Sequence, residues 1–226
     1  METGLSLSRD KIVSFFAFFS VGLKYYEGVK HQNPNSSLLS MPNARNEANP
    51  GARLLNAARD LFYSHGYAMA GINEVIEKSN TSKKSFYNYY PSKTDLGRAF
   101  LHLEKESLCD LVDHFIQKNP KNYRAFVSAW CRFLKTLAKS KTYKGCPFAN
   151  LSAQSSGEFD LEISETMNLL KEKFINFLEN SDLTLNKKDS ERKARSILVL
   201  YQGCIQMWKL TGDVNYFDQF KEQLLV

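Results

Sequence analysis

The sequence predicts an all-α protein, and three observations support this. Apolar residues recur at the helical spacing of three and four along most of the chain, and the strict alternation of a half-buried strand is missing. Glycine is scarce, with 11 in 226 residues, whereas the helix formers Leu, Lys, Glu and Ala are frequent. Hydrophobic residues make up 43% and charged residues 24%, an ordinary globular composition. This length suits one domain or two small ones.

The charge balance and the cysteines narrow the class of protein. Thirty Lys and Arg against 24 Asp and Glu give a net charge of +6, which suits an anionic partner. The cysteines form no C-x-x-C pair and are too few for a disulfide framework in so long a chain. We expect a reduced, cytoplasmic protein without a metal or cofactor. The four cysteines are Cys109, Cys131, Cys146 and Cys204.

Residues 1–50 differ in character from the rest of the chain. The apolar run 12–23 has twelve residues, too few for a bilayer span of about 20 residues, although a signal-peptide core has this length. The stretch 31–50 is rich in Asn, Ser and Pro, as flexible linkers are. We expect residues 1–50 to be a flexible or wrongly assigned extension, in which Met41 is the true start and residues 1–40 are an artefact or dispensable. No membrane association is expected.

Two helices begin the regular part of the chain, and each has a readable end. The first begins near Arg53, and Gly66 ends it after its last apolar position. The second follows Gly71, which can serve as its N-cap. It ends near Asn80, where Asn can take the left-handed conformation of a tight turn. The apolar faces of the two helices consist of Leu54, Ala57, Ala58, Leu61, Phe62, Ile72, Val75 and Ile76.

A short third helix and a long fourth helix follow. Thr81 or Ser82 can cap the third helix, which has Phe86 as its inward residue and ends before a proline. Ser92 can cap the fourth helix. The apolar face of the fourth helix consists of Leu96, Ala99, Phe100 and Leu103. Short helices joined by a tight turn form the helix-turn-helix pattern, so we predict a three-helix DNA-binding domain over residues 51–100.

The outer face of the third helix carries side chains that suit DNA. Such a helix fits the major groove, where its first residues reach base edges. Lysines supply charge for phosphates, Ser and Asn read base edges, and tyrosine hydroxyls donate to phosphate oxygens. Lys93 adds charge beside free N–H groups that favour anions. A solvated basic face is the alternative. The candidate DNA-binding residues are Ser82, Lys83, Lys84, Ser85, Tyr87, Asn88, Tyr89 and Lys93.

Residues 101–226 are expected to form a larger helical domain. Residues 104–117 are expected to continue the fourth helix. Helices are also predicted over 123–139 and 148–155, followed by two longer helices with heptad-like apolar spacing. The second long helix is apolar nearly all round, which requires burial on more than one face. A two-fold homodimer would supply that burial. The two stripes are Ile163, Met167, Leu170, Phe174 and Phe177, and Ile197, Tyr201, Cys204, Trp208 and Thr211.

Aromatic residues of this larger domain are candidate contacts for a small apolar or electrophilic ligand, and plain core packing is the alternative. Cys146 begins a predicted helix, where unpaired N–H groups favour a thiolate and lower its pKa. Lys141 and Lys144 add positive potential. Cys146 is thus a candidate sensor of electrophiles or oxidants, with the other cysteines buried and inert. Packing of a small residue at the helix start is the alternative. The candidate ligand-binding residues are Trp130, Phe133, Cys146, Phe148, Phe174, Tyr201 and Trp208.

Catalysis is not expected from this sequence. It contains no H-E-x-x-H, G-x-S-x-G, P-loop or GxGxxG element, and its four histidines are scattered. Cys146 has no His or acidic partner placed beside it by the sequence. The alternative to a DNA-binding regulator is an interaction module, or a membrane-anchored one, that keeps the fold without binding DNA.

Two motifs stand in register within residues 52–101. They are A-R-D-L-F-x3-G-Y, which ends at Tyr67, and S-F-Y-N-Y-Y-P-S-K over residues 85–93. With them the whole stretch resembles the DNA-binding domain of the TetR family of transcription regulators. The resemblance implies a dimer that binds a near-palindromic operator in double-stranded DNA, usually as a repressor. The larger domain would then sense a ligand and form the dimer.

The resemblance also implies roles for individual residues. Lys84 and Ser85 would contact bases or lie near them. Phosphate contacts would come from Ser82, Lys83, Tyr87, Tyr89 and Lys93. Two departures leave the operator sequence open: Ala70-Gly71 stands where the family often has Thr, and Lys84 stands where it often has Gly.

A second segment, residues 145–153, reads G-C-x-x-x-N-L-x-A. It is similar to a segment in the ligand domain of a subset of these regulators. The overall layout resembles the subset that includes N-ethylmaleimide-responsive and quinone-responsive repressors. This similarity is compatible with either an apolar or an electrophilic effector.

Overall fold

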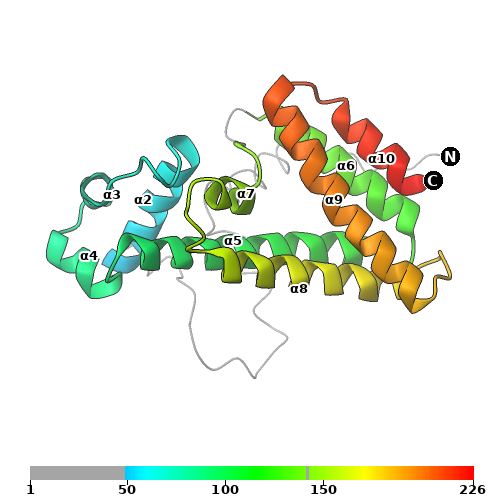
Figure 1. Cartoon of the computed structure of the whole chain (residues 1–226), viewed down its shortest axis with the longest axis horizontal. Helices are drawn as coiled ribbons and strands as arrows, with labels where there is room; N and C mark the ends of the chain where they lie inside the picture. The colour runs from blue at the N-terminus through cyan, green and yellow to red at the C-terminus, as the bar shows by residue number, and fades with distance from the viewer. Residues whose placement is uncertain (1–48, 141–142) are drawn as a thin grey trace.

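The computed structural model describes residues 49–140 and 143–226, and every regular element in these ranges is an α-helix. The all-α prediction is confirmed. The helices are α2 (Pro50–Ser64), α3 (Ile72–Lys78), α4 (Lys83–Tyr89), α5 (Lys93–Lys118), α6 (Tyr123–Ala138), α7 (Pro147–Ser152), α8 (Asp160–Glu179), α9 (Lys187–Thr211) and α10 (Tyr216–Leu225) (Figure 1). The apolar run 12–23, Met41 and Lys141 lie outside the described residues.

One long helix connects two groups of helices (Figure 1). At one end α2, α3 and α4 pack on one another and form the N-terminal unit; α6 to α10 form the C-terminal bundle. α8 lies along α5, and α9 packs on α8 and α10. α5 has 26 residues, a length of about 39 Å at 1.5 Å per residue. The boundary expected at residue 100 therefore falls inside a continuous helix.

The turns and caps of the N-terminal unit follow the sequence signals. Ser82 and Ser92 are the N-caps of α4 and α5, and their hydroxyl oxygens accept hydrogen bonds from the backbone N–H groups three residues on. Gly66, after α2, has φ +87°, and Asn80, between α3 and α4, has φ 49°. Asn80 thus takes the left-handed conformation that the sequence predicts for this turn.

The last helix, α10, was not predicted. Phe217, Phe220 and Leu224 are at most 2% exposed, and α10 packs on α6 and α9. The three buried side chains are spaced three and four residues apart, which is the usual signal of an amphipathic helix. The sequence therefore contained enough information to predict α10. A smaller difference lies at the start of α2, which begins at Pro50, three residues before the expected position.

A buried ion pair fixes the N-terminal unit on α5. Arg59 Nε, from α2, donates to Glu104 Oε1 at 2.9 Å, and the Tyr63 hydroxyl donates to Glu104 Oε2 at 2.6 Å. The side chains of Arg59 and Glu104 are only 8% and 1% exposed. Burial raises the pKa of the Glu104 carboxyl, while Arg59 and Tyr63 act in the opposite direction. Both oxygens of this carboxyl are thereby satisfied by side chains of α2.

Candidate nucleic-acid interface

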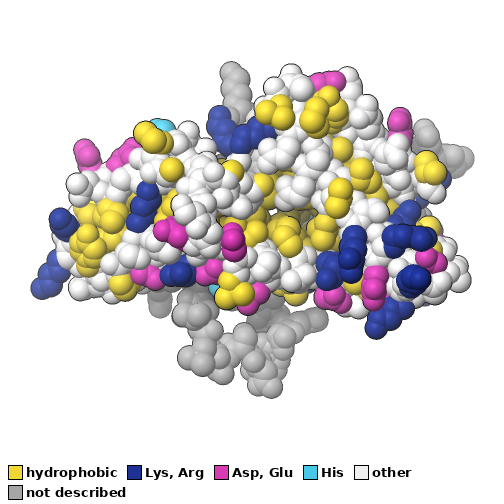
Figure 2. All heavy atoms as spheres, viewed as in Figure 1, with side chains coloured by type: hydrophobic (Ala, Val, Ile, Leu, Met, Phe, Trp, Pro, Cys, Tyr) yellow, Lys and Arg dark blue, Asp and Glu magenta, His cyan; other side chains and the backbone are white. Residues whose placement is uncertain are grey.

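The predicted DNA contacts on α4 share its outward face. Phe86 is fully buried beneath the helix, and Ser85 is half-buried. Figure 2 shows basic and hydrophobic side chains gathered over the end of the molecule that holds α4. The exposed residues of this face are Ser82, Lys83, Lys84, Tyr87, Asn88 and Tyr89. The structure therefore brings these candidates together on one surface.

Contacts from α2 hold α4 and its preceding turn in place. Arg53 donates from Nε to the Ser79 carbonyl at 3.1 Å and from a terminal nitrogen to the Asn80 carbonyl at 3.3 Å. At the other end of α4, the Tyr90 hydroxyl donates to the Gly51 carbonyl at 3.1 Å. Sequence reasoning missed both residues, because neither partner is near in the chain. The exposed face of α4 therefore sits on a fixed helix.

The charge of α4 is positive and lies in its first turn. Its sequence, KKSFYNY, contains two lysines and no acidic residue. Lysine side chains that reach solvent at the start of a helix supply the charge that neutralises DNA phosphates. The same N-terminal end presents backbone N–H groups, which also favour anions.

Lys93 lies apart from the α4 face and has a partner within the protein. Its ammonium donates to the Ala68 carbonyl at 3.1 Å and lies 4.6 Å from the centre of the Tyr67 ring. Partial burial lowers the pKa of Lys93, and the charge of Glu158 acts in the opposite direction. Lys93 thus braces the turn between α2 and α3, a contact that the sequence did not predict.

Substitutions on α4 separate base contacts from phosphate contacts. Lys84→Ala and Ser85→Ala are expected to relax the preference at particular base pairs, at a cost of about 1–3 kcal/mol each on the operator. Lys83→Ala should weaken binding to all DNA sequences nearly equally. It should also reduce the slope of log affinity against log salt concentration by about one unit for each phosphate that Lys83 no longer neutralises. Affinities for operator and unrelated duplexes, measured across salt concentrations, distinguish these results.

The matched control is Lys78→Ala on α3, whose ammonium pairs with Asp60 at 3.3 Å. It removes one positive charge without touching α4. Equal losses on operator and unrelated DNA for all three α4 variants would contradict the proposed division of roles.

In the C-terminal bundle the ligand candidates come together only in part. The Trp130 ring centre lies 5.3 Å from that of Phe174 and 5.7 Å from that of Tyr201. Trp208 instead stacks on Tyr143 at 5.3 Å. Trp130, Phe174 and Tyr201 therefore form one aromatic cluster between α6, α8 and α9. Trp208 joins it only through Tyr143, whose side chain hydrogen-bonds with Tyr201.

Cys146 and Phe148 lie at the start of α7 and are 1% exposed, whereas Phe133 is half-buried. Burial raises the pKa of the Cys146 thiol. Gln202 Nε2, which donates to Cys146 Sγ at 3.1 Å, and the backbone N–H groups of Phe148 and Ala149 act in the opposite direction. The expected lowering of this pKa is wrong, because burial outweighs the effect of the helix start.

Alkylation should therefore follow exposure. Cys131 and Cys204 are buried as expected, but Cys109 is only half-buried, which corrects the prediction for that residue. In the native protein, N-ethylmaleimide is expected to modify Cys109 first and Cys146 much more slowly, because burial raises the pKa of both thiols but only the Cys109 thiol is partly exposed to the reagent. Peptide mass spectrometry over time measures the order. Faster labelling of Cys146 than of Cys109 would contradict this account.

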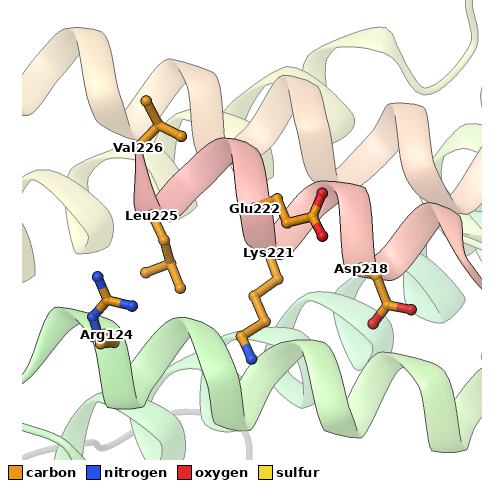
Figure 3. A pocket seen from close by; sticks show the side chains of 6 residues that line it. All are labelled: Arg124, Asp218, Lys221, Glu222, Leu225 and Val226. Atoms are coloured by element: carbon orange, nitrogen blue, oxygen red, sulfur yellow. The ribbon is translucent and has the colours of Figure 1, made fainter.

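A surface pocket of about 440 Å³ lies between α6 and α10 (Figure 3). It is lined by Arg124, Asp218, Lys221, Glu222, Leu225 and Val226. Its charges are of both signs, and none of the predicted site residues lines it. Among the residues that the structure describes, no group of three or more His, Cys, Asp or Glu side chains is placed to hold a metal ion. No helix in that part is long and apolar enough to cross a membrane.

Comparisons with known proteins agree with this geometry. Residues 54–100 match the family model described as bacterial regulatory proteins, tetR family. The chain is 27% identical over 182 residues to an HTH-type transcriptional regulator of Lactococcus lactis subsp. lactis, with 76% of this chain and 90% of that protein covered. It is 26% identical over 113 residues to the HTH-type transcriptional repressor NemR of Escherichia coli K12, with 50% and 57% covered.

Solved structures show the same fold. A TetR-family transcriptional regulator from Streptomyces coelicolor has a TM-score of 0.68 at 19% identity, covering 78% of this chain and 92% of that one. Reduced Escherichia coli NemR also has a TM-score of 0.68 at 19% identity, covering 78% and 95%. These regulators share with this chain a helix-turn-helix unit that a long helix joins to an all-α bundle. Residues 54–100 match the DNA-binding domain of the TetR family, and the chain as a whole is similar to regulators of that family.

Proposed function

We propose that the protein is a transcriptional repressor that binds a near-palindromic operator as a homodimer. The exposed, basic face of α4, held on a fixed helix, is the observation that supports this most strongly. A helix of this kind enters the major groove, and two of them in a symmetric dimer read two half-sites. Residues 51–100 would form the DNA-binding domain and residues 101–226 the sensing and dimerisation domain.

The dimer would form through α8 and α9. Val199, Gly203 and Leu210 lie along one exposed face of α9, with Val199 71% and Leu210 78% exposed. A Cβ built at Gly203 would meet no atom within 4 Å, which leaves room for the close approach of a partner helix. On α8, Leu161 is 67% and Leu169 39% exposed. Apolar side chains of this size on neighbouring helices suit a self-complementary interface.

A small apolar effector is the ligand that the bundle favours. The cluster of Trp130, Phe174 and Tyr201 supplies aromatic surface. Within the described residues, two buried polar atoms near it, Trp130 Nε1 and Gln202 Oε1, have no hydrogen-bond partner. Such atoms are costly to leave unpaired, so a ligand with one acceptor and one donor would stabilise them. The burial of Cys146 favours this apolar effector over an electrophilic one. Such a repressor would work in the cytoplasm, where the DNA is.

The experiment that tests this function is selection of bound duplexes from random DNA by the full chain. The expected product is one motif with two inverted half-sites, lost when Lys84→Ala and Asn88→Ala are combined. Binding to the selected duplex should weaken steeply with salt. A wild-type protein that enriches no motif would instead support the alternative, an interaction module that does not bind DNA.

A further inference from the structure

Phe159 is a fully buried side chain between the N-terminal unit and α8. It is the residue that precedes α8 and is 0% exposed. Its ring meets the Tyr67 ring edge-on, with centres 5.2 Å apart and planes at 86°. Gly97 of α5 lies beside both rings, where an added Cβ would come within 2.6 Å of Phe159 Cζ and 3.1 Å of Tyr67 Cε2. The absence of a side chain at Gly97 makes the space that this ring fills.

The Phe159 ring also continues an aromatic row into the core of the N-terminal unit. Tyr67 contacts Phe62 with ring centres 5.2 Å apart, and Phe62 contacts Phe100 at 5.3 Å. All of these residues are at most 7% exposed. Edge-to-face rings in a packed interior have little freedom to slide, because each sits in a shape made by its neighbours.

Polar contacts surround this buried ring. Gln154, just before it, accepts a hydrogen bond from the Ala68 backbone N–H at 3.2 Å. The Tyr67 hydroxyl donates to Glu158 at 3.4 Å. Arg98 of α5 pairs with Glu162 of α8 at 2.8 Å. The segment before α8 thus contacts the turn between α2 and α3 through Gln154 and Glu158 as well as through the Phe159 ring.

We propose that Phe159 sets the tilt of the N-terminal unit on α8 and thereby selects the spacing between operator half-sites. This inference rests on the proposed function, in which α8 belongs to the dimer interface. In that dimer α8 belongs to the interface that joins the two chains. The angle between the N-terminal unit and α8, which Phe159 holds, therefore fixes the distance between the two α4 helices. One base pair more or less moves a half-site by about 3.4 Å and turns it by about 35°. If the contact between the N-terminal unit and α8 is rigid, the dimer binds operators of altered spacing poorly. If this contact is loose, the dimer adapts and binds them with little loss of affinity.

Phe159→Leu and Gly97→Ala both loosen this contact. The first shortens the buried side chain, and the second places a Cβ where the Phe159 ring lies. The matched control is Phe217→Leu, which makes the same change at a fully buried phenylalanine of α10. Binding is measured on the selected operator and on versions with its centre lengthened or shortened by one and two base pairs.

Wild-type protein is expected to lose at least about tenfold in affinity per base pair of altered spacing, the scale of one mismatched base pair. Phe159→Leu and Gly97→Ala should bind the operator with the best spacing more weakly than wild type does. At the other spacings, their affinity should fall by less than about threefold relative to their own affinity at the best spacing. Phe217→Leu should keep the wild-type profile. A Phe159→Leu profile parallel to that of wild type would overturn the proposal, since a loss of stability alone lowers all spacings equally.

A second measurement needs neither DNA nor a dimer. Two spin labels are attached in a Cys109→Ser background, at Asn88→Cys on α4 and at Glu172→Cys on α8. The labelled protein is diluted with unlabelled chain, so that the distance between the two labels reports the tilt within one protomer. The distance distribution should be narrow in wild type and broad in Phe159→Leu. A distribution that stays narrow overturns the proposal even if the wild type binds a palindrome. A wild type that binds no DNA refutes the proposed function, and the distances still decide the role of Phe159.

Discussion

Glu104→Ala is expected to lower the free energy of unfolding by about 3–5 kcal/mol, because it leaves the Arg59 guanidinium buried without a counter-charge. The pair is 2.9 Å long and almost fully removed from solvent. The substitution also takes the acceptor from the Tyr63 hydroxyl. A loss of this size is a large part of the stability of an ordinary domain, about 5–15 kcal/mol.

The measurement is urea denaturation followed by circular dichroism at a fixed chain concentration, since dimers gain stability with concentration. The control replaces both charges, as Arg59→Met with Glu104→Leu, and should be considerably more stable than the single variant. A loss below about 1 kcal/mol, the scale of an exposed ion pair, would show that this pair is not buried in solution.

Val199→Glu is expected to turn the dimer into a monomer and to weaken operator binding by about 10²–10⁴-fold. The first effect follows because a carboxylate at the centre of an apolar interface would be buried without a partner. The second follows because two linked half-site contacts gain a factor of this size from effective concentration. Sedimentation gives the oligomeric state, and fluorescence anisotropy with labelled operator gives the affinity.

The matched control is Val226→Glu, which adds the same charge at an exposed valine outside the α8–α9 face. It should leave both the dimer and the affinity unchanged. A Val199→Glu protein that stays dimeric and binds DNA normally would show that the interface lies elsewhere on the molecule.

Local signals made the N-terminal unit predictable. The caps Ser82 and Ser92 and the turn at Asn80 depend on residues within a few positions of each other. Phe86 is the one apolar residue that α4 turns inward, so the outward direction of its neighbours follows from helix geometry alone. The exposed α4 face could therefore be predicted without knowledge of the tertiary structure.

Apart from α10, whose local apolar spacing was overlooked, the features that were missed depend on contacts between distant parts of the chain. The pKa of Cys146 follows from its burial and from Gln202, which lies 56 residues away. Lys93 finds the Ala68 carbonyl 25 residues earlier. Glu104 meets Arg59 across 45 residues. A helix start or an isolated charge can be recognised in a sequence, but the side chains that surround it in the fold cannot.

Two copies of α4 are proposed to read one symmetric site, and the number of chains bound to each duplex tests this proposal. Native mass spectrometry of the full chain with its selected duplex should give two chains per duplex. Scrambling one half-site should weaken binding by at least about a hundredfold. One chain per duplex, with equal affinity for the intact and the half-scrambled site, would contradict the account.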